Sequence, residues 1–248
     1  MTSRILRGIG RAALALLLVL VLVTLGFLVW AHMVMQGDRD RALDVWTTET
    51  VTVTSTDHSV VLAPTTGGTD TGLVFIPGAK VDPYAYMYKL SGVVEEAGVT
   101  VVITKPALNL AFFDTHPLAD YAADASEVEH WYVGGHSLGG VRACMLVDAA
   151  SEPGIDGLVL FGSYCANDLS QSGLRVLSIA ASNDGLSTAA KIDGAANMLP
   201  ADADFTVLDG ANHAQFGDYG TQPGDLDSTV TTEAVREEIT GLLVGFLR

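Results

Sequence analysis

The sequence predicts an α/β protein with a mostly parallel sheet and helices on both faces. Two observations lead to this prediction. Short apolar runs typical of buried strands alternate with segments in which apolar residues recur at helical spacing. The chain of 248 residues, 49% of them hydrophobic, is long enough for one domain with a large core beside an apolar N-terminal segment. We expect right-handed connections between the parallel strands.

The first expected element is a membrane-spanning helix over residues 12–31. This stretch contains neither a charge nor a proline, and as a helix it would be about 30 Å long, the thickness of a bilayer core. A cleaved signal peptide is the alternative, but its apolar part is usually about 7 to 15 residues long and ends in a small-x-small site. The run ends instead in Val29-Trp30-Ala31-His32-Met33, where Trp30 suits an interfacial anchor. We therefore expect an uncleaved anchor.

Charge is divided unevenly along the chain. Residues 1–35 contain three arginines and no acidic residue, whereas the rest contains 10 basic and 29 acidic residues, for a net charge of −16 overall. By the positive-inside rule, the N-terminus lies in the cytoplasm and the following domain outside the cell membrane. The acidic surface argues against nucleic acid as a partner. The expected organisation is a cytoplasmic N-terminus and anchor (1–35), a linker (36–48) and one domain (49–248). Residues 33–46 read as a short polar connection or as a helical extension.

The elements of this domain follow from its apolar pattern. Two runs rich in Val and Thr, at 50–54 and 59–63, predict a hairpin. Asp82-Pro83 can start a helix, and a stripe of apolar residues predicts a closing helix near the end of the chain. Further strands are expected at 72–76, 99–104, 131–134, 157–161, 175–181 and 205–208, and helices at 82–94, 117–125, 138–150 and 235–246.

The most informative stretch runs from His130 to Gly140. An aromatic and β-branched run passes into a turn with one serine between small residues, and helical spacing follows, which predicts a strand, a sharp turn and a helix. Glycines at 135 and 139 would let strand and helix approach closely. Ser137 would then project from the sheet, and the backbone N–H of Leu138, at the helix N-terminus, could stabilise a developing oxyanion.

This stretch resembles the α/β-hydrolase superfamily, whose G-x-S-x-G signature is matched by Gly135-His136-Ser137-Leu138-Gly139. Within the superfamily the chain looks most like the small dienelactone-hydrolase-like serine hydrolases, through residues 75–80, 135–140 and 212–220. The resemblance covers 49–248 and implies the α/β-hydrolase fold. It also implies that the second oxyanion donor is the backbone N–H of Ala79.

A serine nucleophile requires a base, and the base requires a group that fixes its tautomer. In this fold the order is Ser, Asp, His, and Asp184 and His213 follow expected strands in that order. Taken alone, Asp184 before Gly185 is more readily interpreted as a turn aspartate. Asp209 and Asp218 are the alternative candidates for the acid of the triad. The other candidate histidines are His58, His116, His130 and His136.

Residues 162–174 leave no room for a lid between two expected strands, so we expect an open site. Lys80 could steer an anionic substrate, although a surface ion pair with Asp82 is the more ordinary role. Aromatic side chains near the site could equally belong to the core. The candidate lining residues are Tyr84, Tyr86, Asn109, Phe112 and Phe113.

Neither a cofactor nor a metal is expected. Asp218, Asp225 and Asp227 invite a calcium site, but their spacing matches no EF-hand-like pattern, and a solvated acidic loop is the simpler interpretation. Cys144 and Cys165 lack metal-site spacing. In an oxidising compartment they could form a disulfide, or Cys144 could be a small core residue.

The expected function is a membrane-anchored serine hydrolase of carboxylic esters. Its partners would be a small-molecule acyl substrate and the lipid bilayer, contacted through residues 12–31. A lactone or amide hydrolase with the same triad is an alternative of the same class. A catalytically silent module on the same fold, which binds a partner outside the cell, is an alternative of another class.

Overall fold

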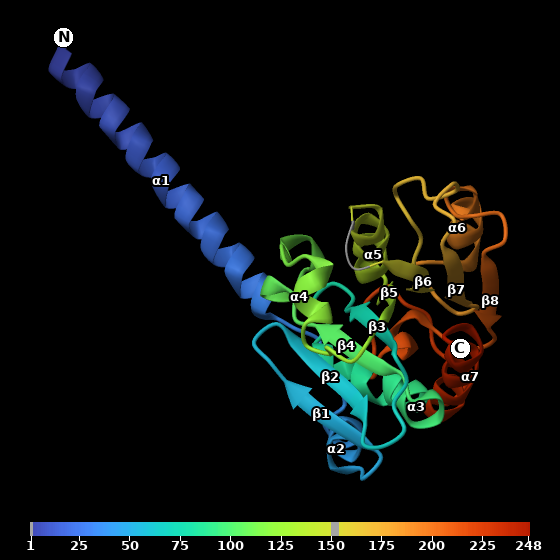
Figure 1. The fold of residues 1–248 in the computed structure, drawn as a ribbon. Helices are drawn as coiled ribbons and strands as arrows, with labels where there is room; N and C mark the ends of the chain where they lie inside the picture. The colour runs from blue at the N-terminus through green and yellow to red at the C-terminus, as the bar shows by residue number, and fades with distance from the viewer. Residues whose placement is uncertain (1, 150–153) are drawn as a thin grey trace. The chain divides into compact units, whose positions relative to one another are not determined.

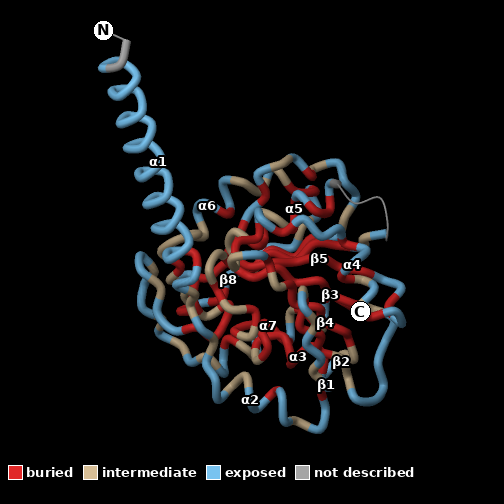
Figure 2. Tube along the Cα trace, turned by 90° about the vertical axis from the view of Figure 1, so that its left-hand side faces the viewer, coloured by how far each residue is buried: buried red, intermediate tan, exposed pale blue. Residues whose placement is uncertain are grey.

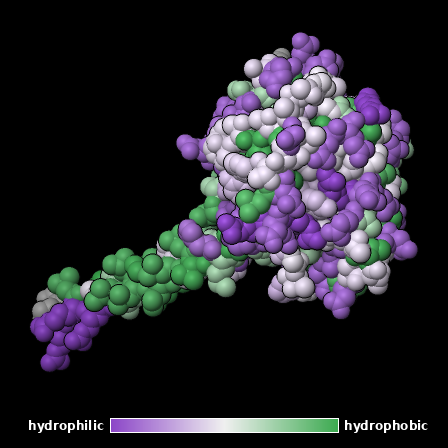
Figure 3. Space-filling view, turned by 90° about the horizontal axis from the view of Figure 1, so that it is seen from below, coloured by the Kyte–Doolittle hydropathy of each residue, from purple (hydrophilic) through white to green (hydrophobic). Residues whose placement is uncertain are grey.

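The structure, a computed structural model, describes residues 2–149 and 154–248, and it divides into two units, Met1–Val34 and Met35–Arg248. In the first unit, α1 (Thr2–His32) is one helix. Its segment Arg4–His32 is the single described helix that is long and apolar enough to cross a membrane. Figure 3 shows the continuous hydrophobic surface of this helix and the hydrophilic group at its N-terminal end.

The second unit is built on one eight-stranded sheet in its described part, with the order β1-β2-β4-β3-β5-β6-β7-β8 (Figure 1). The pairs β1–β2 and β2–β4 are antiparallel, and all later pairs are parallel. This confirms the predicted fold class and the predicted hairpin. The strands are β1 (Val51–Ser55), β2 (Ser59–Pro64), β3 (Thr71–Ile76), β4 (Thr100–Thr104), β5 (His130–His136), β6 (Ile155–Phe161), β7 (Arg175–Ala181) and β8 (Asp204–Leu208).

Helices cover both faces of the sheet, and each face has its own core. Alternate residues of β3 show this division, because Leu73 and Phe75 belong to one core while Val74 and Ile76 belong to the other. Figure 2 shows the strands as the most deeply buried part of the unit. The α-helices are α2 (Arg39–Thr47), α3 (Met87–Ala97), α4 (Leu118–Ala122), α5 (Leu138–Ala149), α6 (Ala189–Gly194) and α7 (Thr232–Phe246).

Local signals explain where the large helices begin and end. Asp82 caps the short 3-10 helix η1 (Pro83–Tyr86), which leads into α3, and Gly98 ends α3 with a φ of 68°. The side chain of Thr231 accepts a hydrogen bond from the N–H of Ala234 and so caps α7. The last residue of the helix predicted at 138–150 lies outside the described residues.

The structure differs from the expected helices at α4 and α6. Residues 189–194, where no helix was expected, form α6. Residues 39–47 form α2, which Asp38 caps and whose Val45 is buried in the core, so of the two readings of this segment the structure has a helix. The helix predicted at 117–125 is shorter, because α4 ends at Ala122. Residues 162–174 contain neither a helix nor a strand.

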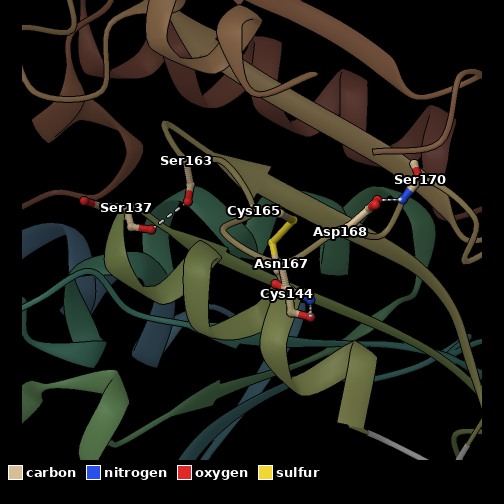
Figure 4. Close-up of a disulfide and its surroundings, with 7 residues drawn as sticks. All are labelled: Ser137, Cys144, Ser163, Cys165, Asn167, Asp168 and Ser170. Atoms are coloured by element: carbon tan, nitrogen blue, oxygen red, sulfur yellow. Dashed lines mark hydrogen bonds between the residues drawn. A yellow bond between two sulfur atoms is a disulfide. The ribbon is translucent and has the colours of Figure 1, made fainter. Parts of the chain in front are cut away.

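A disulfide joins Cys144 of α5 to Cys165, which follows β6 (Figure 4). The side chain of Asn167 also donates to the carbonyl of Cys144, at 3.2 Å. The segment after β6 is therefore attached to the helix that follows the serine turn. The two cysteines therefore form a disulfide, which was one of the two expected possibilities.

Candidate active site

Ser137 lies in the turn between β5 and α5, and its backbone is held in a strained conformation with a φ of 52°. Its N–H donates to the carbonyl of Phe161 at 3.0 Å. Its carbonyl accepts a hydrogen bond from the Ser163 hydroxyl at 2.7 Å. Figure 4 shows the Ser137 carbonyl facing Ser163 and the Ser137 hydroxyl pointing away from it. The turn thus fixes the backbone and leaves the hydroxyl outside these contacts.

The two glycines of the turn have no room for a side chain. A Cβ on Gly135 would lie 2.4 Å from the carbonyl carbon of Gly139, and a Cβ on Gly139 would lie 2.1 Å from the carbonyl oxygen of Ile76. Real Cβ atoms essentially never come this close to other atoms. The close approach of β5, α5 and the end of β3 therefore has the steric origin that the sequence suggested.

Asp184 and His213 meet in the interior at the same edge of the sheet. Asp184 follows β7 and His213 follows β8, and these two strands are paired. The Nδ1 atom of His213 lies 2.7 Å from Oδ2 of Asp184. The other carboxylate oxygen, Oδ1, accepts from the backbone N–H groups of Leu186 at 2.8 Å and Ser187 at 2.6 Å. The carboxylate is therefore fixed by its own turn while it orients the imidazole.

Burial distinguishes this pair from other histidine–aspartate pairs in the chain. His213 is 0% exposed and Asp184 is 2% exposed. Three other histidines also face an aspartate, but the side chains of those histidines are solvent-accessible. These pairs are His58–Asp124 at 3.0 Å, His116–Asp114 at 2.8 Å and His130–Asp156 at 2.8 Å.

The second ring nitrogen of His213, Nε2, is buried and has no hydrogen-bond partner among the described residues. A hydrogen bond between this atom and the Ser137 hydroxyl is thus not formed in this structure. Catalytic hydrogen bonds are often long or poorly aligned before substrate binds. The geometry gives an oriented imidazole with one nitrogen held by Asp184 and the other available.

His136 is the nearest aromatic neighbour of His213, with ring centroids 4.4 Å apart. The Tyr86 hydroxyl accepts a hydrogen bond from the Gly78 N–H at 2.9 Å and forms a second hydrogen bond with Nδ1 of His136 at 2.8 Å. Burial, and after it the charge of His213, lowers the pKa of His136 well below its ordinary value. His136 therefore stays neutral beside His213. Tyr86, expected among the lining residues, is instead fully buried.

Leu138 and Ala79 are both partly exposed near this turn. Among the described residues, the backbone N–H groups of Leu138 and Ala79 donate to no protein acceptor. Gly78, beside Ala79, is held by Tyr86, and the N–H of Lys80 donates to the carbonyl of Asn109 at 2.7 Å. The loop that contains Ala79 is therefore fixed on both sides of it. Phe112 and Phe113, two of the expected lining residues, are exposed.

The two alternative candidates for the triad acid, Asp209 and Asp218, have other partners. Asp209 accepts a hydrogen bond from the Ser182 hydroxyl at 3.2 Å. Asp218 forms a buried ion pair with Lys89, with Nζ 2.8 Å from Oδ1. Burial raises the pKa of Asp218 and lowers the pKa of Lys89. Within the described residues, no group of three or more His, Cys, Asp or Glu side chains could hold a metal ion.

Sequence reasoning did not identify the roles that three residues have around the pair, although it named Tyr86 as a lining residue and Asp225 in an acidic loop. Tyr86 supports His136 and the loop of Ala79, Lys89 neutralises Asp218, and Asp225 accepts backbone hydrogen bonds near His213. No motif marks these positions, because each acts on a segment distant in sequence. The helical pattern that contains Lys89 could have raised the question, since it places a lysine on a buried helix face.

Comparison with known proteins identifies the family. A model of the alpha/beta hydrolase family matches residues 72–237. The chain belongs to this family. The match includes the serine turn, Asp184 and His213, and it agrees with the resemblance that the G-x-S-x-G motif suggested.

Solved structures of several other proteins share the fold at low sequence identity. TT1662 from Thermus thermophilus is 16% identical, with a TM-score of 0.54, and the match covers 80% of this chain and 98% of that one. A carboxylesterase, CesB, from Bacillus subtilis is 13% identical, with a TM-score of 0.53 and coverage of 83% and 95%. Carboxyl esterase 2 from the fungus Tuber melanosporum is 13% identical, with a TM-score of 0.52 and coverage of 86% and 91%. No curated protein sequence gave a significant match.

Proposed function

We propose that this alpha/beta hydrolase is a serine hydrolase that cleaves carboxylic esters through an acyl-enzyme. The observation that carries the proposal is the buried pair of His213 and Asp184, 2.7 Å apart, at the sheet edge where the strained turn presents Ser137. A buried imidazole with one nitrogen held by a carboxylate and the other without a partner is suited to general-base catalysis. Two of the similar structures are described as carboxylesterases, which favours esters as the first substrates to test.

In the proposed acylation step, the Ser137 hydroxyl attacks the ester carbonyl while Nε2 of His213 takes its proton. Asp184 holds the Nδ1–H and stabilises the imidazolium that forms. Negative charge develops on the carbonyl oxygen, and the N–H groups of Leu138 and Ala79 donate to it. Each such donor typically lowers the barrier by about 3 to 4 kcal/mol.

Collapse of the tetrahedral intermediate breaks the bond to the alcohol, which leaves with the proton from His213. A water molecule then attacks the acyl-enzyme, again with His213 as the base, and releases the carboxylic acid. His136 does not compete for these protons, because burial keeps its pKa well below the ordinary value. The chemistry requires no group besides these side chains and water.

The proposal includes a membrane tether. The helix Arg4–His32 is apolar enough to span a bilayer, and the arginines near its N-terminus favour a cytoplasmic N-terminus. The hydrolase unit would then lie on the outer face of the cell membrane. A protease-protection assay on sealed vesicles distinguishes this orientation from its reverse, and N-terminal sequencing of the membrane fraction distinguishes an anchor from a cleaved signal peptide.

The test uses the full chain in detergent, with p-nitrophenyl acetate hydrolysis and covalent labelling by a fluorophosphonate as the two readouts. Ser137→Ala should abolish labelling and reduce turnover by about 10⁶-fold. A panel with a lactone and a p-nitroanilide shows whether esters are preferred over the alternatives. Wild-type protein that neither reacts with the probe nor hydrolyses any substrate would support a binding module instead.

His130 provides a matched control for the histidine. Its ring faces Asp156 at 2.8 Å, almost as His213 faces Asp184, but it is exposed on the surface. We expect His213→Ala to remove activity and His130→Ala to leave it at the wild-type level. Equal effects of the two substitutions would count against His213 as the base.

A further inference from the structure

One carboxylate connects the two turns that contain Asp184 and His213. Oδ1 of Asp225 accepts from the backbone N–H of Gly185 at 3.0 Å and from that of His213 at 3.3 Å. Oδ2 of the same side chain accepts from the N–H of Ala214 at 2.9 Å. Asp225 lies 40 residues after Gly185 and 12 residues after His213. The residue thus links segments that meet only in the folded chain.

Neighbours of Asp225 bind the same two turns. We name residues 224–228 the clasp loop. The side chain of Asn183, next to Asp184, donates to the carbonyl of Asp227 at 2.9 Å. The side chain of Asn212, next to His213, donates to the carbonyl of Leu226 at 2.7 Å. The clasp loop therefore has hydrogen bonds to both turns from its backbone as well as from its acidic side chain.

The contact between the clasp loop and the Asp184 turn is close. A Cβ on Gly185 would lie 2.5 Å from the carbonyl oxygen of Gly224 and 3.1 Å from the Cα of Asp225. Glycine at 185 is therefore what allows the carboxylate to reach the turn. Both carboxylate oxygens of Asp225 already accept hydrogen bonds from backbone N–H groups. The side chain therefore holds the backbone rather than a cation.

We propose that Asp225 is a positioning residue that keeps the Asp184 turn and the His213 turn in register. The inference rests on the proposed function. An imidazole that must take a proton from Ser137 has to be placed within a few tenths of an ångström, and the backbone on either side of its hydrogen bond to Asp184 decides that placement. Charge-assisted hydrogen bonds to three N–H groups in two turns supply the constraint.

Two substitutions in the full chain test this role. Asp225→Asn keeps the shape but turns one acceptor into a donor that faces an N–H group, and Asp225→Ala removes both acceptors. We expect kcat for p-nitrophenyl acetate to fall about 10-fold and about 100-fold respectively, with KM changed by less than about twofold. The rate of fluorophosphonate labelling should fall in proportion, while the fraction of protein labelled at completion stays that of the wild type.

Asp227→Asn is the matched control, since the Asp227 side chain is exposed in the same loop and only its backbone carbonyl is engaged. It should match the wild type in kcat. The proposal is overturned if both Asp225 variants keep wild-type kcat, if Asp227→Asn has an equal effect, or if the loss comes only from fewer labelled molecules, which indicates misfolding. Wild-type protein that does not label would remove the proposed function itself, a result distinct from any of these.

Discussion

The serine turn and the histidine turn are held in place by different means. Around Ser137 the constraint is steric, because Gly135 and Gly139 let backbone segments approach to distances that exclude any side chain. Around His213 the constraint is polar, because Asp184 and Asp225 accept hydrogen bonds from its ring and from its backbone. In the serine turn the residues that allow the close approach are glycines of the turn itself, whereas the histidine turn depends on carboxylates of two other segments.

This difference has consequences for substitutions at the two turns. Where the constraint is steric, a substitution that adds an atom creates a clash, and we expect it to lower the stability of the fold first. Where the constraint is polar, a substitution that removes a charge or a hydrogen-bond acceptor can lower the rate of catalysis while the protein stays folded. The predictions below test this distinction, from the largest expected effect to the smallest.

Asp184→Asn should have the largest effect. An amide at this position favours the wrong tautomer of His213, and in serine hydrolases with this arrangement such a change reduces kcat by about 10⁴-fold. Thermal stability should change little by comparison, as expected for a polar constraint. Steady-state kinetics and the melting temperature are measured together, with the exposed Asp209→Asn as a control that should keep wild-type kcat. A loss of folding with no separate loss of rate would contradict the distinction.

Lys89→Met should destabilise the segment that contains His213. Asp218 follows the η5 helix (His213–Phe216), and without Lys89 it would keep a buried charge with no partner. Removing one member of a buried ion pair typically costs about 3 to 5 kcal/mol. Urea unfolding measures the loss. Lys89→Met with Asp218→Leu should recover most of it, since an apolar pair needs no compensation. A double variant as unstable as the single one would show that the pair does more than neutralise charge.

Gly139→Ala tests the steric side. The added methyl group would lie 2.1 Å from the carbonyl oxygen of Ile76, so we expect a loss of about 3 kcal/mol in the free energy of unfolding. Gly241→Ala is the control, because Gly241 is an exposed residue of α7 with nothing within 4 Å of the added carbon. There alanine should stabilise the helix by about 1 kcal/mol. Tolerance of both changes would mean that the serine turn is not sterically constrained.

Ser163→Ala should have the smallest effect. It removes the hydrogen bond to the Ser137 carbonyl, but the N–H groups of Gly140 and Val141 also donate to that oxygen. No buried acceptor is left unsatisfied, so the expected loss is about 1 kcal/mol. Activity should fall much less than in the Asp184 variant, as measured under the same conditions. A loss of activity as large as that of Asp184→Asn would show that the serine turn also depends on polar support.

The same difference explains what the sequence could predict. The serine turn was predicted from adjacent residues, and the order of strands and polar residues was enough to nominate Asp184 and His213. The polar supports could not be predicted in this way, because Asp225, Lys89 and Tyr86 act across long sequence separations. The polar residues 39–47 allowed either a connection or a helical extension, and the packing of their Val45 into the core could not be predicted from this short segment.

The roles of Ser137, Asp184 and His213, and of Leu138 and Ala79 as oxyanion donors, stay predictions until activity is measured. Ester specificity has the same status. Family membership and fold are established by the match over residues 72–237 and by the eight-stranded sheet in the described part of the chain. The fold was predictable because apolar periodicity encodes it directly, whereas a substrate leaves no such regular pattern.

Met35 pairs with the segment after Ala79. Its N–H donates to the carbonyl of Lys80 at 2.7 Å, and its carbonyl accepts from the N–H of Asp82 at 2.9 Å, so it forms a short parallel bridge with Val81. A proteolytic cut near this point would therefore have two outcomes according to its position. Cleavage upstream of Met35 would leave the bridge to residues 80–82 intact, whereas cleavage just downstream would remove the strand-like partner of Lys80 and Asp82 and loosen the segment that follows Ala79.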